Sequence, residues 1–268
     1  MDFDKMIEKM QFGLIGQELE YLGTTIEKLI TNYQKDFQDE DDKYKQSIEE
    51  LKQSGEYYEP LDEEHAPGVT YGQMMEYNLR EPFFELESFS SIIIESLIIK
   101  HVAYIEDILI KISFMVQKNE KQVIPPDHNI TGHFTDMLKA VDYIKLVTNN
   151  EIKIRDTRNW KMITLLRTLR HELAHGNRSF VLKEGVIDDI NKEAPLINKG
   201  MIILKNFDHT QGLAQYGIEA GQQPKDPKNE WNCSICSNIN VLKKINEICI
   251  DFIDEVKSIY TQKYDIQR

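Results

Sequence analysis

The chain has little of three things: cysteine, long apolar runs and positive charge. Its 268 residues include 3 cysteines, and 45 Asp and Glu against 32 Lys and Arg give a formal charge of −13. Because Cys233, Cys236 and Cys249 leave one thiol over after any pairing, a disulfide framework is ruled out and a reducing compartment is favoured. The acidity argues against a protein that coats nucleic acid or anionic membrane with its whole surface, but it is compatible with a local basic site.

No segment has the pattern of a membrane span or a secretory signal. The most apolar stretch, SSIIIESLIIKHVAYIEDILIKISFMV, is interrupted by charged residues and by His101, so it lacks the uninterrupted apolar length that a bilayer span needs. The amino-terminal stretch MDFDKMIEKM opens with acids rather than with a basic region and an apolar run. We therefore expect a cytoplasmic protein with no membrane partner.

Apolar residues recur at three- and four-residue steps through much of the chain, which predicts amphipathic helices. The first covers residues 3–33 with an interruption near Gly13 and Gly16, and the acidic stretch 36–64 follows as a solvated helix and linker. Four further helices are predicted: 84 to about 116, 131–147 capped by Thr131, a segment from a cap at Asp156 or Thr157 to Gly176, and 239–264. This pattern predicts an all-α protein built as a helical bundle.

Two short β-branched runs interrupt the helical pattern. SFVLKEGVI and KGMIILKNF, around Gly185 and Gly200, predict a small β-hairpin, and the stretch that follows them reads as a loop. We divide the chain into an N-terminal helical and acidic linker region, 1–82, and a helical bundle, 83–268, that carries the hairpin in an insertion at about 178–235.

The helix that ends near Gly176 carries the candidate site. On a helical wheel its core-facing stripe is Met162, Leu165, Leu166, Leu169, Leu173 and Gly176. The opposite arc carries Thr164, Arg167, Arg170, His171, Ala174 and His175. Residues 151–183 hold eight basic residues against three acidic ones in an otherwise acidic chain, and such an asymmetry favours an anionic ligand.

The string RHELAHG has two interpretations. In the first, HELAH matches the HExxH pattern, in which two histidines on one helix face bind Zn²⁺ and the glutamate acts as a base. His171, Glu172 and His175 then take the roles they have in gluzincin metallopeptidases. The extended motif is incomplete because Val181 stands where its next histidine belongs, and Glu193 is the best-spaced substitute for the third ligand.

In the second interpretation, Arg170, polar His171, three further residues and then His175 resemble the R-polar-x3-H signature of the HEPN superfamily of ribonucleases. That family is a helical bundle with its motif near the C-terminal end of a helix. An aromatic and acid pair like Tyr104 and Glu106 occurs on an upstream helix in several of its branches. The resemblance covers roughly residues 84–180 and the last helix, and it leaves the N-terminal region and the predicted hairpin unassigned.

The resemblance implies a metal-independent endoribonuclease with no cofactor. His175 would be the general base or proton shuttle at the ribose 2′-OH, and Arg170 would bind the scissile phosphate. The expected products carry 2′,3′-cyclic phosphate and 5′-hydroxyl ends. The remaining roles are support, by His171, Glu106 and Asn177, and RNA binding, by Arg167, Arg178 and Lys161.

In this family two copies of the motif face each other across a dimer, so RNA and a second copy of the chain are the expected partners, together with an antitoxin or sensor protein. Proteins of this resemblance act as toxins or antiviral-defence effectors. A helical interaction module without catalysis is the third alternative, because Arg and His on a polar helix face are ordinarily surface residues. The CxxC pair, Cys233 and Cys236, has no second pair and is interpreted as two incidental thiols in a loop.

Overall fold

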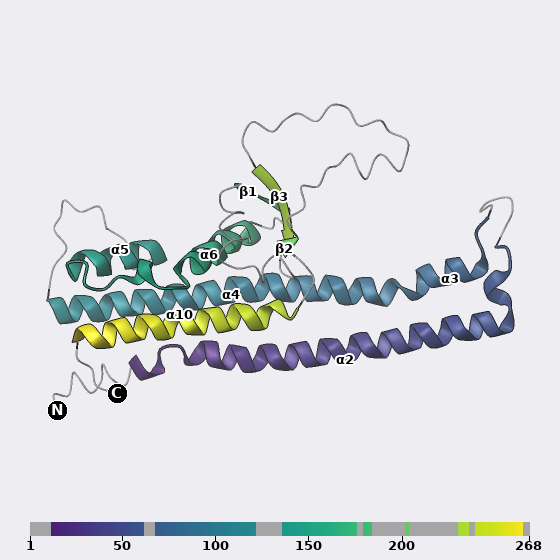
Figure 1. Cartoon of the computed structure of the whole chain (residues 1–268), viewed down its shortest axis with the longest axis horizontal. Coiled ribbons are helices and arrows are strands. Elements are labelled where there is room, and N and C mark those ends of the chain that lie inside the picture. The colour runs from purple at the N-terminus through teal and green to yellow at the C-terminus, as the bar shows by residue number, and fades with distance from the viewer. Residues whose placement is uncertain are drawn as a thin grey trace.

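Helices make up most of the part of the chain that the structure, a computed structural model, describes: residues 12–61, 68–121, 136–175, 179–183, 202–203, 230–235 and 239–264. In chain order the elements are α2 (Gln17–Ser54), the 3₁₀ turn η1 (Glu56–Tyr58), α3 (Tyr71–Leu79), α4 (Glu81–Glu120), α5 (Met137–Val147), the 3₁₀ turn η2 (Ile154–Asp156), α6 (Trp160–Ala174), β1 (Ser179–Lys183), β2 (Ile202–Ile203), β3 (Glu230–Ile235) and α10 (Val241–Tyr264). The predicted all-α class is confirmed, with one small sheet beside the helices (Figure 1).

Helix α2 is a single rod of 38 residues because nothing in its sequence breaks it. It contains no proline, and glycines with positive φ stand at both ends, Gly16 at 94° and Gly55 at 86°. Only glycine adopts this left-handed conformation freely, so the two positions define where the helix begins and ends. The predicted interruption near Gly16 is confirmed. The acidic stretch is helical as predicted as far as Ser54, but it continues the preceding helix without a break.

At the far end of α2 the chain reverses, and α4 returns antiparallel to α2 (Figure 1). Thr70 and Gln73 form a reciprocal capping box at the start of α3. The ring of Tyr57 lies over Gly72, in the first turn of α3. A Cβ atom at residue 72 would come within 2.2 Å of a ring carbon, so this close contact between η1 and α3 requires glycine. The Tyr57 hydroxyl also donates to Glu76 Oε1 at 2.8 Å, which ties η1 to α3.

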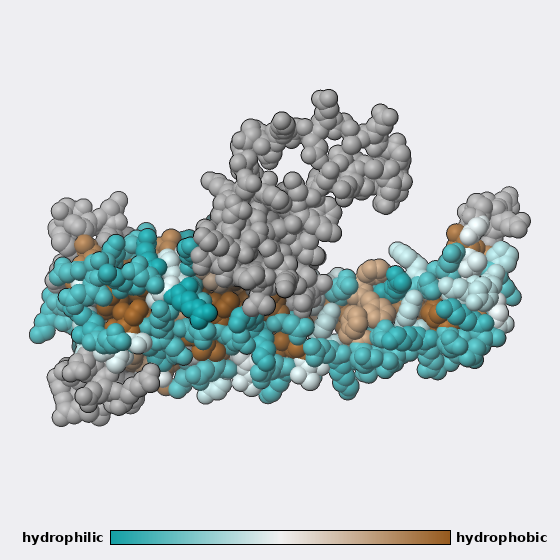
Figure 2. Space-filling view, in the orientation of Figure 1, coloured by the Kyte–Doolittle hydropathy of each residue, from teal (hydrophilic) through white to brown (hydrophobic). Residues whose placement is uncertain are grey.

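Helix α4 is the centre of the body of the molecule, where it packs against α2, α5, α6 and α10. Its buried apolar residues recur at three- and four-residue steps: Ile94, Ile98, Val102, Ile105, Ile108, Leu109, Ile112 and Val116. The buried residues of α2 belong to the same core: Leu19, Leu22, Ile26 and Ile30. Segments on both sides of the predicted boundary at residue 82 therefore pack together. Figure 2 shows the outcome, a largely hydrophilic surface with apolar residues in the seams between helices.

Helices α2 and α4 extend past the start of α10 as an arm (Figure 1). Gln34 Nε2 donates to Asn240 Oδ1 at 3.3 Å, immediately before α10 begins, and this contact marks the junction. We call residues 35–61 and 68–92 the arm, and the rest of the described helices the body. Within the described ranges, no helix combines the length with the low charge and high hydropathy that a membrane span requires.

The strands form a three-stranded sheet in the order β1-β3-β2, with β3 antiparallel to both neighbours. Within the described strands the two predicted runs are not paired with each other, so the expected hairpin between them is not confirmed. The central strand, Glu230–Ile235, lies in the stretch interpreted as a loop. Its sequence EWNCSI alternates polar and apolar residues, a period-two pattern that identifies a strand. Cys233 therefore lies in a strand rather than in a loop.

The predicted start of α6 is wrong. Helix α6 begins at Trp160, and Asn159 is its N-cap residue without a side-chain cap. Asp156 ends η2, and the Thr157 hydroxyl donates to the carbonyl oxygen of Ile154 at 2.7 Å, whereas a helix cap would accept from a backbone N–H of the first turn. A short polar side chain next to a turn can satisfy the turn's own backbone, and here it does so.

Helix α5 begins at Met137, and its N-cap residue is Asp136. Oδ1 of Asp136 accepts hydrogen bonds from the backbone N–H groups of Leu138 at 2.8 Å and Lys139 at 3.2 Å. These two N–H donors belong to the first turn of the helix, where backbone N–H groups have no acceptor inside the helix. The predicted cap, Thr131, and the predicted stop of α6, Gly176, both lie outside the described residues.

A buried polar contact joins three helices of the body. His101 of α4 is fully buried, with Nδ1 2.6 Å from the carbonyl oxygen of Leu97 and Nε2 3.0 Å from Oδ1 of Asn246 on α10. Gly23 of α2 makes room on the other side of Asn246, because a Cβ atom there would come within 2.5 Å of Asn246 Nδ2. Leaving a buried polar group without a partner costs about 1–3 kcal/mol. The contact therefore holds α2, α4 and α10 in one alignment.

Replacing Gly23 with alanine is expected to destabilise the protein by about 1–3 kcal/mol, the usual range for overpacking a core. The added methyl group must displace Asn246 and disturb its hydrogen bond with His101. Urea unfolding followed by circular dichroism measures the change. Gly13→Ala is the matched control, because no atom lies within 4 Å of a Cβ built there, and it should keep or raise stability. Wild-type stability in Gly23→Ala would contradict the prediction.

His101 gives a second prediction, for pH. Burial lowers the pKa of His101 from its ordinary value of 6.5, against smaller opposing effects of Leu97 and Asn246. Above 6.5 the ring is neutral in both states, and stability does not depend on it. Below 6.5 the unfolded chain binds a proton that the folded chain does not, so the free energy of unfolding falls by at most about 1.4 kcal/mol per pH unit.

Urea unfolding between about pH 7.5 and pH 5.5 tests this, since the range spans the titration of an ordinary histidine. His101→Gln should show a shallower fall in stability than wild type. The same slope in wild type and His101→Gln would show that the buried ring does not titrate differently in the two states.

Candidate active site

Helix α6 packs one side on the core and leaves the other open, as the helical wheel predicts. The buried residues are Met162, Leu165, Leu166, Leu169 and Leu173, joined by Trp160 and Ile163. On the other side Arg167 and Arg170 are partly exposed, and His171 and His175 are exposed. The core packing of α6 therefore presents the four polar side chains of the motif region to solvent.

Arg170 of α6 meets Glu106 of α4. Arg170 Nη1 lies 3.4 Å from Glu106 Oε2, and the two side chains are 37% and 18% exposed. The other carboxylate oxygen, Oε1, accepts a hydrogen bond from the backbone N–H of Met137 at 3.3 Å. Glu106 thus holds Arg170 and the start of α5 in one place. A guanidinium carries five N–H donors, so one contact leaves others available for an anionic ligand.

A second ion pair lies one helical turn away. Arg167 Nη2 is 2.8 Å from Oδ2 of Asp136, the residue that caps α5. Partial burial raises the pKa of the Asp136 carboxyl, but hydrogen bonds from Arg167 and from the N–H groups of Lys139 and Leu138 together outweigh burial and hold that pKa below its usual value of 3.8. The two arginines are i and i+3 on α6, so both ion pairs share one face of the helix.

The two motif histidines lie at the end of α6. The helix ends at Ala174, and His175 follows as the C-cap residue, with its N–H donating to the carbonyl oxygen of Glu172 at 3.2 Å. The rings of His171 and His175 meet edge to face, with centroids 4.6 Å apart and planes at 78°. Both side chains are exposed, so a ligand in solvent can reach either ring.

Of the other predicted site residues, Lys161 does not join this cluster. Lys161 is exposed in the first turn of α6, and His175 follows the last turn, so about 21 Å separates the two along the axis at 1.5 Å per residue. Lys161 is therefore placed to contact only a long ligand that also reaches the histidines. Asn177 and Arg178 lie outside the described residues.

The positive charge near α6 is smaller than the sequence count suggests. Three cations of the segment 151–183 form ion pairs with carboxylates from outside it: Arg155 with Asp142, Arg167 with Asp136, and Arg170 with Glu106. Asp136 was not among the predicted site residues. A signal for it was present, because an Asp immediately before an apolar helical run is a typical N-cap.

The HExxH interpretation finds part of its geometry. His171 and His175 are close, but Glu193, the substitute third ligand, lies outside the described residues. Over the described ranges, no group of three or more His, Cys, Asp and Glu side chains is placed to hold a metal ion. Cys236 is also outside those ranges, and the third cysteine, Cys249, is buried in α10, where burial raises the pKa of its thiol.

No protein-family model matches the chain, and no curated protein or solved structure is significantly similar to it. Functional inference therefore depends on the residues of α6 and the contacts that hold them. Two features of α6 are combined here: an arginine, Arg170, paired with a carboxylate from another helix, and a pair of solvent-exposed imidazoles, His171 and His175, at the end of the helix.

The cap formed by Asp136 gives a third prediction. Asp136→Ala should destabilise the protein by about 1–2 kcal/mol, the range for losing an N-cap, whereas Asp136→Asn should recover most of this because its amide oxygen still accepts the two N–H groups. Since the folded-state pKa is lowered, the contribution of the Asp136 charge is present above pH 3.8 and is lost as the pH falls further. Urea unfolding at about pH 7 and about pH 3 measures both effects.

Asp142→Ala is the matched control. Asp142 forms an ion pair with Arg155 at 2.7 Å, but it caps no helix, and both side chains are about half exposed. Exposed ion pairs contribute about 0–1 kcal/mol, so this variant should remain close to wild type. A larger loss in Asp142→Ala than in Asp136→Ala would overturn the assignment of Asp136 as the cap that orders the start of α5.

Proposed function

We propose that the protein is a metal-independent endoribonuclease of the HEPN type, which its RHELAHG segment resembles. The observation that carries the proposal is the position of Arg170, held by Glu106 at the surface of α6, the helix that the exposed His175 follows as its C-cap residue. Cleavage of RNA without a metal needs a fixed cation for the phosphate and a base that is partly neutral near pH 7. Arginine and histidine meet these two needs.

In this mechanism His175 accepts the proton of a ribose 2′-OH, and the 2′-oxygen attacks the adjacent phosphorus. The P–O5′ bond breaks, which leaves a 2′,3′-cyclic phosphate on one product and a 5′-hydroxyl on the other. Arg170 donates to the phosphate oxygens, where charge builds up in the transition state. The 5′-oxygen needs a proton from a second imidazolium, which His175 of the partner subunit supplies in a homodimer with a composite site.

The remaining motif residues have supporting roles in this proposal. Glu106 is a positioning residue, because it holds the Arg170 guanidinium and the first N–H of α5 together. His171 lies edge to face with His175 and limits the directions that its ring can take. Arg167 is held by Asp136 one turn from Arg170, where it can contact a neighbouring phosphate.

The biological setting belongs to the same proposal. A cytoplasmic ribonuclease of this type would act as a toxin or an antiviral-defence effector, restrained by an antitoxin or a sensor protein. The zinc metallopeptidase and the noncatalytic helical module are the competing functions, and the same set of variants separates all three.

Purified protein incubated with RNA in EDTA tests the proposal. Arg170→Ala should reduce cleavage at least about 100-fold, the usual cost of removing a donor to the transition state. His175→Ala should reduce it about 100- to 10,000-fold, the range for losing a general base. Arg155→Ala is the matched control, because Arg155 is another surface arginine with a carboxylate partner, and it should cleave as wild type does. Circular dichroism verifies the fold of each variant.

Each alternative predicts a different result. If the protein is a peptidase, EDTA should abolish its peptidase activity and added Zn²⁺ should restore it. Glu172→Ala should also abolish that activity, whereas Arg170→Ala should leave it unchanged. A noncatalytic module would leave RNA intact in wild type and in every variant. RNA cleavage in EDTA that survives both Arg170→Ala and His175→Ala would reject the proposed site.

A further inference from the structure

The arm exposes an apolar strip on the first turns of α4. Phe84, Phe89 and Ile92 are 54%, 55% and 47% exposed, and Tyr77 of α3 is 73% exposed. Together they line an open groove with a volume of about 760 Å³. Figure 2 shows apolar residues on the surface of the arm between α3 and the grey region. An exposed apolar patch with a polar rim is typical of a protein interaction site.

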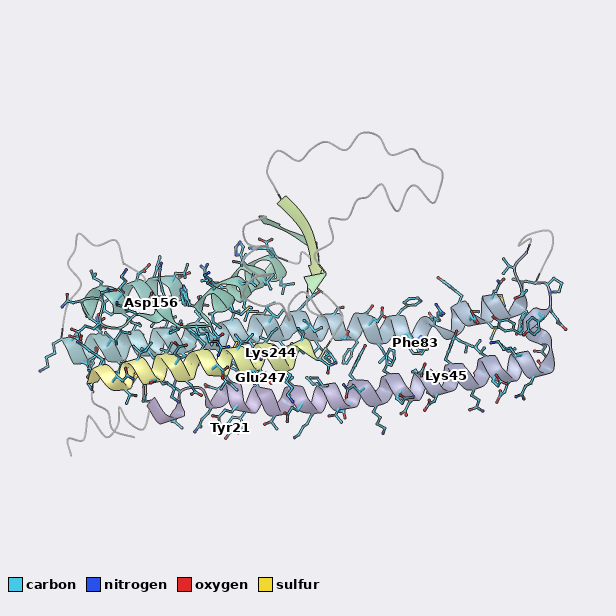
Figure 3. All side chains as sticks on the ribbon, in the orientation of Figure 1. Tyr21, Lys45, Phe83, Asp156, Lys244 and Glu247 are labelled. Carbon is cyan, nitrogen blue, oxygen red and sulfur yellow. The ribbon has the colours of Figure 1, made fainter. Side chains whose placement is uncertain are left out.

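These side chains are not the ones that hold the arm together. Phe83 packs between α4 and α2, where its ring lies 5.2 Å from that of Phe37 and 6.0 Å from that of Tyr44 (Figure 3). Phe84 is the next residue and is turned about 100° around the helix, away from that packing. The face of α4 that carries Phe83 therefore packs against α2 and stabilises the arm, whereas the apolar strip lies on another face of the same helix.

The strip continues a face of α4 that the body covers. Residues 85, 92, 99 and 106 are seven apart, and a seven-residue step returns to nearly the same side of a helix. At residue 106 that side meets Arg170 of α6 and the start of α5. In the arm it carries exposed aromatic and aliphatic side chains. The strip thus has the character of a helix-packing face that none of the helices in the described ranges covers.

The charges of the groove limit the class of partner. Glu81 and Glu85 line it one helical turn apart, and none of the described residues that line it is a Lys or Arg. Carboxylates repel the phosphates of RNA and of anionic lipid headgroups. An isologous contact with a second copy would bring the same two carboxylates near their own equivalents, and like charges across an interface are unfavourable. The groove instead complements apolar residues flanked by Lys or Arg.

The shape of the groove favours a helix. Phe84, Ser88 and Ile92 follow one another at four-residue steps, so the small Ser88 leaves a notch between two large side chains. Ridges formed by residues four apart, with notches between them, are what a second helix packs against. We propose that the arm docks a basic amphipathic helix of a partner protein, with its apolar side chains over Phe84, Phe89 and Ile92 and its Lys or Arg side chains against Glu81 and Glu85. This site is separate from the ribonuclease proposal and does not depend on it.

A synthetic peptide tests the docking site in the full-length protein. The probe is a fluorescein-labelled amphipathic helix with leucine along one face and lysine on its flanks, and fluorescence anisotropy measures its binding. Phe84→Ser/Phe89→Ser should weaken binding at least about tenfold, because it removes two central apolar contacts. Glu81→Gln/Glu85→Gln should weaken it at least about fivefold at low salt and less at high salt. A peptide with glutamate in place of lysine should bind at least about tenfold more weakly.

The control variant is Glu49→Gln/Glu50→Gln, which removes the same charge from exposed residues of α2 in the arm. It should bind the lysine peptide as wild type does. If this control and Glu81→Gln/Glu85→Gln lose the same affinity for the lysine peptide, the binding depends only on the overall negative charge of the protein, and the proposal is overturned. Wild-type affinity in Phe84→Ser/Phe89→Ser, or equal affinity for both peptides, would overturn it as well.

Two further measurements keep the test decisive. Circular dichroism checks the fold, and Phe89→Ser alone serves if the double variant unfolds, with a weakening of at least about threefold expected because one of the two rings that line the groove is removed. Sedimentation velocity compares wild type with the Phe variant. A wild-type dimer that becomes a monomer only in the Phe variant would show that a second copy fills the groove, and the proposal would then be wrong.

Discussion

The whole structure depends on the burial of helix α4. Its buried isoleucines, leucines and valines pack against α2, α5, α6 and α10, and burying each such side chain contributes about 1.5–3 kcal/mol. Among the described elements, α4 packs against the most partners. The position of α6 follows from this packing, because its own leucine stripe lies on the same core. The candidate site is therefore placed by apolar contacts, and its polar residues adjust the position that those contacts set.

Glu106 links the packing of the helices to the candidate site. It lies on α4, is largely shielded from solvent, and contacts both the start of α5 and the guanidinium of Arg170. A carboxylate with two partners has less freedom than one with a single partner, so Arg170 is restrained more than an ordinary surface arginine. Asp136 has the same double role one turn away, since it caps α5 and holds Arg167. The start of α5 and the polar face of α6 are thereby ordered by one pair of acids.

Much of this arrangement follows from the sequence. The stripe of α6 and the glycine that precedes α2 were identifiable because helical periodicity and glycine conformation are local properties. The ion pairs were harder to anticipate, since Glu106 and Arg170 are 64 residues apart and Asp136 and Arg167 are 31 apart. Only packing reveals such contacts, and Glu106 was anticipated through a family resemblance rather than from periodicity.

The caps proposed at Asp156 and Thr157 were wrong for a local reason, because a 3₁₀ turn ends at this point of the chain. The strand at Glu230–Ile235 was missed although its alternation was present.

Helix α4 also sets a distance. It runs for 40 residues with no glycine and with its one proline in the first turn, so it has no built-in hinge between the arm and the site. From Glu85 to Glu106 the helix rises about 32 Å. A ligand on the arm and a ligand at Arg170 would not collide, and the rod would hold both at a constant separation. A partner bound to the groove of the arm would therefore leave the site at Arg170 accessible to a second ligand, and α4 would act as a spacer of fixed length between the two.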